Sequence, residues 1–141
     1  MAEASTADTA AALAQQPAGA EATYRVIVHP SNPATAIDRK FLEDAFLKKV
    51  SRWSNDTAIR PADLPPSSAV RGRFTRDVLA RSVAAVRAYW HQRIFSGRGV
   101  PPPELLSDER VVAYVLEHEG AIGYVSASAA IASDRVIRVT R

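Results

Sequence analysis

Short runs of β-forming residues alternate with apolar residues at helical spacing along residues 24–139, and this alternation constrains the fold more than any other feature. Strand composition predicts β-strands at 24–28, 57–60, 121–125 and 136–139. Strands separated by helices are typical of α/β proteins, in which helices cover a central sheet. We therefore predict an α/β fold, with a central mixed sheet flanked by about four helices.

Four segments show helical spacing. The predicted N-caps are Asp38 for the first helix, Ser67 or Ser68 for the second and Ser107 for the fourth, and the third helix is predicted to start at Ser82. We expect the second helix to span 68–80, the third to end at Gly97, and Gly120 to be the C′ residue of the fourth. The inward-facing positions are predicted to be Phe41, Leu42, Ala45 and Phe46, then Val70, Phe74, Val78 and Leu79, then Val83, Val86, Tyr89, Trp90 and Ile94, and finally Val111, Val112, Val115 and Leu116.

Residues 1–22 differ in composition from the rest of the chain. They contain ten alanines and three acidic residues, but no basic or aromatic residue. We expect a flexible leader or linker there and one folded domain over 23–141, since 141 residues is the usual size of a single domain. The formal charge of the chain is +3, and residues 23–141 carry +6 because the leader is acidic.

Several kinds of chemistry are disfavoured by the residues. The absence of cysteine excludes disulfide scaffolds, thiolate metal sites and cysteine nucleophiles. His29, His91 and His118 show no HxxxH or HExxH spacing, and there is no GxSxG nucleophile elbow. We therefore predict no metal, no cofactor and no enzymatic activity.

Membrane-spanning and nucleic-acid-binding proteins are also disfavoured. No stretch approaches the roughly 18 consecutive apolar residues of a transmembrane helix, and we find no signal peptide in this chain. The sequence matches no recognised nucleic-acid module, and its aromatic residues fall on apolar stripes rather than among the arginines.

Arginine is concentrated in residues 60–98, which hold eight arginines, no lysine and only two acidic residues. The planar guanidinium group binds phosphate or carboxylate through two parallel hydrogen bonds. Arg71 and Arg73 follow Ser67 and Ser68, so these four residues form a candidate oxyanion site at a helix start. A solvated arginine-rich face is the alternative interpretation.

Four short sequences carry a family resemblance: FLEDAFLKKVSRW at 41–53, DTAI at 56–59, GRG at 97–99 and GAIGYV at 120–125. In this order they resemble segments of the phosphate-binding proteins of phosphate ABC transporters, which have the type 2 periplasmic-binding-protein fold. The most specific is GAIGYV. The resemblance runs from about residue 24 to 139 and implies a single lobe of that fold.

The chain departs from this family in length and in its anion motif. Family members with two lobes are much longer, and only their later part is matched. Relatives carry an Arg shortly before Ser-Gly-Thr at a helix start, whereas this chain has Ser68-Ala69-Val70 there and Asp63 or Leu64 in place of the Arg. Only Ser68 carries over from the family, so Ser67, Arg71 and Arg73 are substitutes suggested by their chemistry. Ser31 and Asn32, in the loop after the first strand, are weaker candidates for the same site.

Two functions remain open from the sequence. The first is a non-enzymatic solute-binding module for phosphate or a similar oxyanion, which the resemblance places in the periplasm or otherwise outside the cytoplasm, with a transporter as partner. The second is an interaction protein that kept the fold, lost the ligand and docks to an envelope partner. A homodimer would be one way to close a half-cleft.

Overall fold

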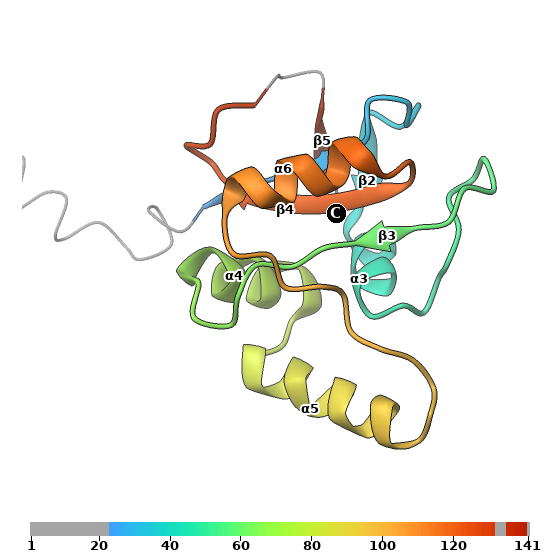
Figure 1. The fold of residues 1–141 in the computed structure, drawn as a ribbon, viewed down its shortest axis with the longest axis vertical. Helices are drawn as coiled ribbons and strands as arrows, with labels where there is room; N and C mark the ends of the chain where they lie inside the picture. Colours follow the sequence, from blue (N-terminus) through green and yellow to red (C-terminus); the bar gives the residue numbers. More distant parts are fainter. Residues whose placement is uncertain (1–22, 132–134, 141) are drawn as a thin grey trace, which may run out of the picture.

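The computed structural model describes residues 23–131 and 135–140, so the predicted leader at 1–22 lies outside the described part. Its centre is a five-stranded sheet with the order β2-β5-β1-β4-β3 (Figure 1). The strands are β1 (Tyr24–Val28), β2 (Ala36–Asp38), β3 (Arg60–Pro61), β4 (Ala121–Ser126) and β5 (Val136–Thr140). β1 pairs antiparallel with β4 and β5, whereas β2–β5 and β3–β4 are parallel pairs. The predicted mixed sheet is thereby confirmed.

Two strands differ from the prediction. β2 has only three residues, too few for an alternating pattern to be recognised in the sequence. The strand expected at 57–60 is displaced to Arg60–Pro61, and Ala58 forms only an isolated bridge with Arg52. The displacement follows from pairing, because Arg60 and Pro61 are the residues that lie beside Ala121 and Ile122 of β4.

The helices are α3 (Arg39–Phe46), α4 (Ala69–Phe74), α5 (Val83–Phe95) and α6 (Asp108–Glu117), with the π-helical segment η1 (Thr75–Leu79) directly after α4. The N-caps Asp38, Ser68 and Ser107 are confirmed, because their side chains accept a backbone N–H from the first turn of their helices. Ser82, predicted as the start of the third helix, is the N-cap of α5 and accepts the N–H of Ala85. The helix predicted over 68–80 is instead an α-helix that continues as η1 and ends at Ala80, whose φ is 54°.

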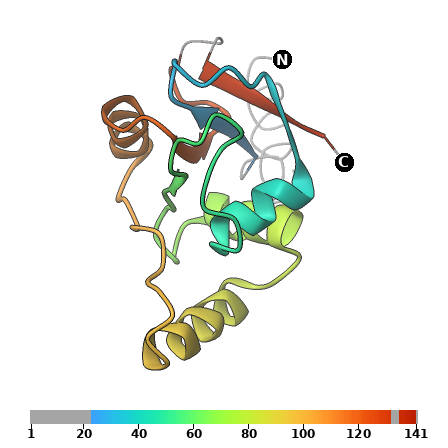
Figure 2. The same cartoon turned by 90° about the vertical axis from the view of Figure 1, so that its right-hand side faces the viewer.

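The core lies on both faces of β4, all of which is buried except Ser126. Alternate residues point to opposite faces. Gly123 lies against Val111 of α6 on one face, and Tyr124 stacks on Phe74 of α4 on the other, with ring centroids 3.9 Å apart. Figure 2 shows α6 and α3 on opposite sides of the sheet. Burial on both faces explains why this strand is continuously apolar.

α5 stands apart from the sheet in both views (Figures 1 and 2). Val86 and Trp90 are buried, but Ile94 is exposed, so its predicted inward position is wrong. The last turn of α5 extends beyond the elements that cover its middle, which leaves Ile94 without full packing. Leu116 of α6 is also exposed, contrary to prediction, because it lies outside the stripe of Val111 and Val115 that faces the sheet.

Gly120 is required by the turn into β4 rather than by the end of α6. The helix ends at Glu117 with His118 as its C-cap, so the prediction of Gly120 as C′ is wrong. Gly120 has φ +82°, and a Cβ there would lie 2.0 Å from the carbonyl oxygen of Ala58. Its own carbonyl accepts a hydrogen bond from Trp53 Nε1 at 2.8 Å.

Within the described residues, no helix combines the length and apolar character needed to cross a bilayer.

We expect Gly120→Ala to lower the free energy of unfolding by about 3 kcal/mol, because it adds a steric clash to a left-handed backbone conformation. Gly97→Ala is a matched control, since Gly97 has φ +71° but a methyl group at its Cα would meet nothing within 4 Å. The control should lose only about 1–2 kcal/mol. Urea unfolding of both variants measures the difference, and equal losses would contradict the clash.

Candidate functional site

A buried polar cluster near α5 joins four segments of the fold. Arg71 of α4 is 3% exposed. Its Nη1 donates to Leu64 O at 3.0 Å and to Glu104 Oε2 at 2.5 Å, and its Nε lies 3.6 Å from Asp63 Oδ1. Tyr124 of β4 donates its hydroxyl hydrogen to Asp63 Oδ1 and accepts the N–H of Leu64 at 3.3 Å. The cluster therefore fixes α4 and the 63–64 segment to the sheet.

Backbone pairing sets the position of the two carboxylates. Asp63 N donates to Pro103 O and Leu105 N donates to Asp63 O, each at 2.8 Å, so Asp63 and Glu104 form a parallel bridge. This bridge extends the edge of the sheet beyond β3 and brings both side chains to Arg71. A buried Arg held by two acidic partners is better compensated than a single buried pair, because more of its donors are satisfied.

Burial raises the pKa of Asp63 from its ordinary value of 3.8 to about 6. The positive charge of Arg71 and the hydrogen bond from Tyr124 oppose this rise, while the nearby Glu104 adds to it. Burial also raises the pKa of Tyr124 well above its usual range, and the charge of Asp63 raises it further. Tyr124 therefore remains a donor at neutral pH, and Asp63 is half ionised near pH 6.

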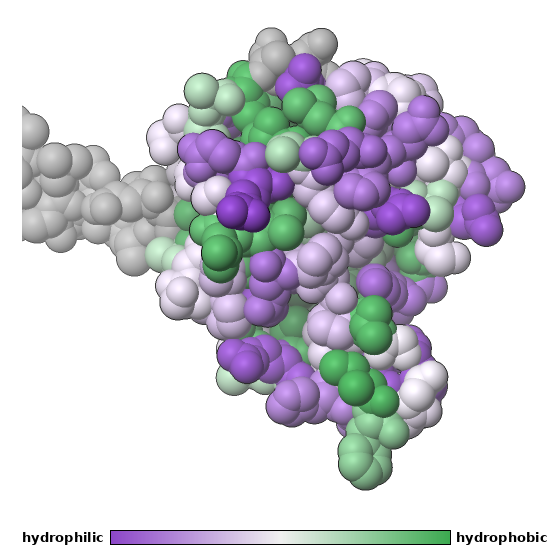
Figure 3. Space-filling model, in the orientation of Figure 1, coloured by the Kyte–Doolittle hydropathy of each residue, from purple (hydrophilic) through white to green (hydrophobic). Residues whose placement is uncertain are grey.

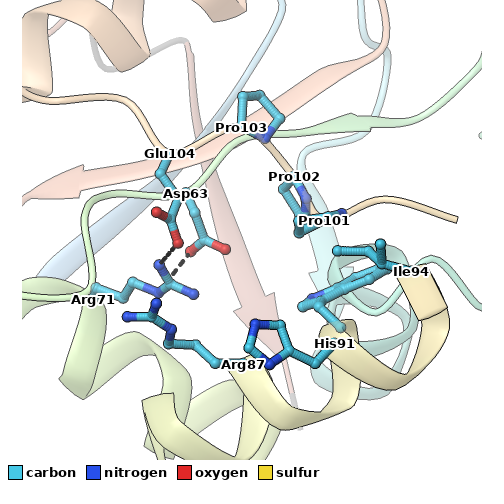
Figure 4. A pocket seen from close by; sticks show the side chains of 10 residues that line it. Asp63, Arg71, Arg87, His91, Ile94, Pro101, Pro102, Pro103 and Glu104 are labelled. Carbon is cyan, nitrogen blue, oxygen red and sulfur yellow. Dashed lines mark hydrogen bonds and ion pairs between the residues drawn. The ribbon is translucent and has the colours of Figure 1, made fainter.

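A pocket of about 400 Å³ lies above the cluster, between α5 and the proline segment 101–103. Asp63, Arg71 and Glu104 form its polar floor (Figure 4). The remaining walls are formed by the residues Arg87, Trp90, His91, Ile94, Pro101, Pro102 and Pro103. The pocket thus combines an apolar wall with several polar groups, which is typical of small-molecule sites.

Arg87 and His91 line the side of this pocket that α5 forms. They lie four residues apart on α5, so they share one helix face. In Figure 4 the guanidinium group of Arg87 lies beside that of Arg71, and the His91 ring faces the space between α5 and the proline segment. In the described part of the chain, neither forms an ion pair, and Arg87 is exposed. The Nε of Arg71 is buried without a hydrogen-bond partner. Within the described residues, Arg87 and His91 are thus donors that line the pocket without an acidic partner.

Of the six residues predicted from the sequence, only Arg71 lines this pocket. Ser68 Oγ accepts the N–H of Arg71 as the N-cap of α4, at 3.2 Å, and Ser67 is exposed in the preceding turn. Arg73 Nε donates to both carboxylate oxygens of Asp77, at 3.1 and 2.9 Å. Arg71 and Arg73 diverge because residues two apart on a helix point to different faces.

Ser31 and Asn32 serve the loop after β1. Ser31 Oγ lies 2.8 Å from His29 Nδ1, and Asn32 Oδ1 accepts the N–H of Ala34 at 2.9 Å. Such local bonds are typical of turn residues. The structure does not gather the six predicted residues at one point, so their common role in ligand binding stays a prediction. No group of three or more His, Asp or Glu in the described ranges has a metal-binding arrangement.

Sequence reasoning missed Asp63, Glu104, Arg87 and His91 as site residues. The four-residue spacing of Arg87 and His91 was a usable signal, because it places both on one helix face. The carboxylates gave no such signal. Asp63 and Glu104 are far apart in sequence and meet only through the bridge beside β3.

We predict that Asp63 makes stability depend on pH in an unusual direction. Its pKa is higher in the folded than in the unfolded chain, so the folded chain binds more protons between pH 3.8 and 6. This contribution to stability is complete below pH 3.8 and is lost as the pH rises through 6. The unfolding free energy of the wild type, minus that of Asp63→Asn, should thus fall by about 2 kcal/mol from pH 4 to 7.

Urea unfolding at several pH values measures this difference, and an NMR titration of the Asp63 carboxyl carbon provides an independent check. The expected midpoint is about 6. A constant difference between the two proteins, together with a midpoint near 3.8, would contradict the desolvated position of Asp63.

Comparison with known proteins gives structural likeness only. No protein-family model matches the sequence, and no curated protein matches it. A putative phosphate ABC transporter substrate-binding protein with bound phosphate from Clostridium perfringens is 21% identical, with a TM-score of 0.59 over 85% of this chain and 46% of that one. An ABC-type phosphate transport receptor from Vibrio cholerae is 16% identical, with a TM-score of 0.62 over 83% of this chain and 46% of the receptor.

PstS from Borrelia burgdorferi gives a TM-score of 0.64 at 14% identity, over 84% of this chain and 47% of that one. This chain therefore spans less than half the length of each of the three structures. The fold expected from the resemblance is confirmed: residues across most of this chain adopt the α/β fold found in part of these phosphate-transport proteins.

Proposed function

We propose that this chain is a non-enzymatic binding module that takes phosphate or a similar small oxyanion in the pocket between α5 and residues 101–104. The observation that carries the proposal is the pair Arg87 and His91, which face the pocket above Arg71 without acidic partners in the described residues (Figure 4). The fold supports it too, because the solved structures with this fold are named as phosphate-binding or phosphate-transport proteins.

The chemistry of the pocket suits an oxyanion held at its cationic side. Arg87 presents several N–H donors in a planar fork that fits two oxygens of phosphate or sulfate. His91 adds a ring N–H donor from the same helix face. Trp90 and the prolines exclude water from one side, which strengthens these charge-assisted hydrogen bonds. Arg71 contributes as a fixed positive charge below, although Asp63 and Glu104 balance it.

The site predicted from the sequence, around Ser67, Ser68, Arg71 and Arg73, is the rival location for the same ligand. Ser67 is exposed and Ser68 is half-buried in the turn before α4, and of these four residues only Arg71 also lines the pocket. Since Arg73 is held by Asp77, binding there requires that ion pair to open, whereas Arg87 needs no such change. We therefore favour the pocket, and a single set of variants separates the two locations.

A role in uptake outside the cytoplasm extends the proposal. The structural neighbours are named as substrate-binding protein and transport receptor of ABC systems, and such proteins deliver a ligand without changing it. Arg87 and His91 are exposed, so the pocket is open on their side. We expect weaker binding than in an enclosed site, since exposed donors gain less from an anion than dry ones.

We predict that phosphate raises the thermal unfolding midpoint relative to chloride at equal ionic strength. A ligand that binds only the folded chain adds about 2.7 kcal/mol at 100 times its Kd. The double variant Arg87→Gln, His91→Gln should lose this increase, and both sites are exposed, so the variant should still fold. Arg73→Gln is the matched control and should retain it.

Comparing Arg73→Gln with the double variant shows whether phosphate binds in the pocket or at the start of α4. Loss in Arg73→Gln with retention in the double variant would move the site to the start of α4. The same midpoint in phosphate and in chloride for the wild-type protein would overturn oxyanion binding altogether. Isothermal titration with phosphate and with sulfate then gives the Kd and the choice of anion.

A further inference from the structure

The C-terminal end of α5 carries an exposed apolar cluster. Ile94 is 47% exposed, Phe95 95% and Val100 62%. We call Ile94, Phe95, Arg98 and Val100 the α5 tip. In Figure 3 apolar residues gather at this end of the molecule, beyond the elements that cover the sheet. Large apolar groups gathered at one exposed point mark interaction surfaces more often than single exposed ones.

The tip is a well-defined turn. Ser96 N donates to Gln92 O at 3.0 Å, Gly97 N to Ile94 O at 3.0 Å, and Arg98 N to Arg93 O at 2.8 Å. Gly97 and Gly99 adopt φ of +71° and +141°, which reverses the chain and leaves Phe95 and Val100 at its outer end. The exposure of Phe95 therefore follows from the shape of the turn.

The segment that carries α5 and the tip has charge of one sign. Residues 78–103 contain four arginines and no acidic residue. Arg93 is the one nearest the tip along α5 and lies 5.2 Å from the Tyr89 ring, whereas Arg81 precedes the helix and Arg87 lies at its middle. Arg98 lies within the tip itself and is exposed. This whole protruding part is thus cationic and ends in apolar side chains.

We propose that the α5 tip docks on the surface of an anionic lipid bilayer. A bilayer offers both complements at once, because anionic headgroups attract the arginines while the acyl boundary accepts Phe95 and Val100. An exposed phenyl ring next to an arginine fits this boundary, where charged and apolar groups lie within a few ångströms of each other. A nucleic acid or an acidic peptide would satisfy Arg98 but leave the apolar residues in water.

This surface is separate from the proposed oxyanion pocket. Phe95, Arg98 and Val100 do not line the pocket. Changes at these three residues therefore test docking alone, whereas Ile94 lines the pocket and is left unchanged. Membrane docking can hold or fail independently of phosphate binding.

Co-sedimentation with vesicles tests the proposal. We expect the wild-type chain to pellet with vesicles of phosphatidylcholine and phosphatidylglycerol, and much less with phosphatidylcholine alone. Phe95→Ser should lower the partition coefficient on the order of tenfold or more, which corresponds to losing the burial of one phenyl group. Arg98→Gln should lower it less, and raising the salt from about 0.1 M to about 1 M should weaken wild-type binding.

Two matched variants control for general effects. Leu106→Ser removes another exposed apolar side chain just before α6, and Arg110→Gln removes an exposed arginine on α6. Both should bind vesicles like the wild type. Circular dichroism of each variant checks folding, which Phe95→Ser should not disturb because its ring packs against little else.

Three results would overturn the proposal. The first is no binding, or equal binding to neutral and anionic vesicles. The second is self-association in sedimentation equilibrium that Phe95→Ser abolishes while vesicle binding is absent, which would make the tip an interface between copies. The third is vesicle binding that depends on Arg98 but not on Phe95, which would reduce the tip to a charge effect.

Discussion

The candidate site depends on the hydrogen bonds of the Tyr124 hydroxyl group. The ring of Tyr124 stacks on Phe74 in the core, while its hydroxyl group donates to Asp63 and accepts the N–H of Leu64. A central strand, a helix and the floor of the pocket therefore meet at one side chain. Because Asp63 also compensates the buried Arg71, the polar cluster and the apolar core hold each other in place.

α5 carries the two proposed binding surfaces at different positions along one helix. Its middle, with Trp90 packed down and Arg87 and His91 turned to the pocket, faces the polar cluster. Its end, with Phe95, faces solvent. This division arises because the body of the fold supports only the first turns of α5. A helix fully packed on the sheet would have neither an open pocket beside it nor an exposed tip.

The sequence predicted local features well and contacts between distant segments poorly. The N-caps Asp38, Ser68 and Ser107 and the strand at 121–125 follow from short patterns that the structure confirms. The inward positions of Ile94 and Leu116 were wrong, because spacing identifies a helix face but not how far its neighbours extend. For a similar reason, the six residues predicted as one site do not lie together in the structure. Arg71 and Arg73 were grouped by proximity in sequence, although they point to different faces of α4.

By itself the sequence determined which segments form helices and strands, because capping and apolar period act within a few residues. It also determined that the segment around α5 is cationic. Only the tertiary structure decided which charged side chains form ion pairs and which have no partner of opposite charge among the described residues. Arg71 meets Glu104 from 33 positions away, and Tyr124 meets Asp63 from 61 positions away. Such pairs depend on how the sheet and the proline segment are placed, so no local pattern distinguishes the compensated Arg71 from Arg87, which has no acidic partner in the described residues.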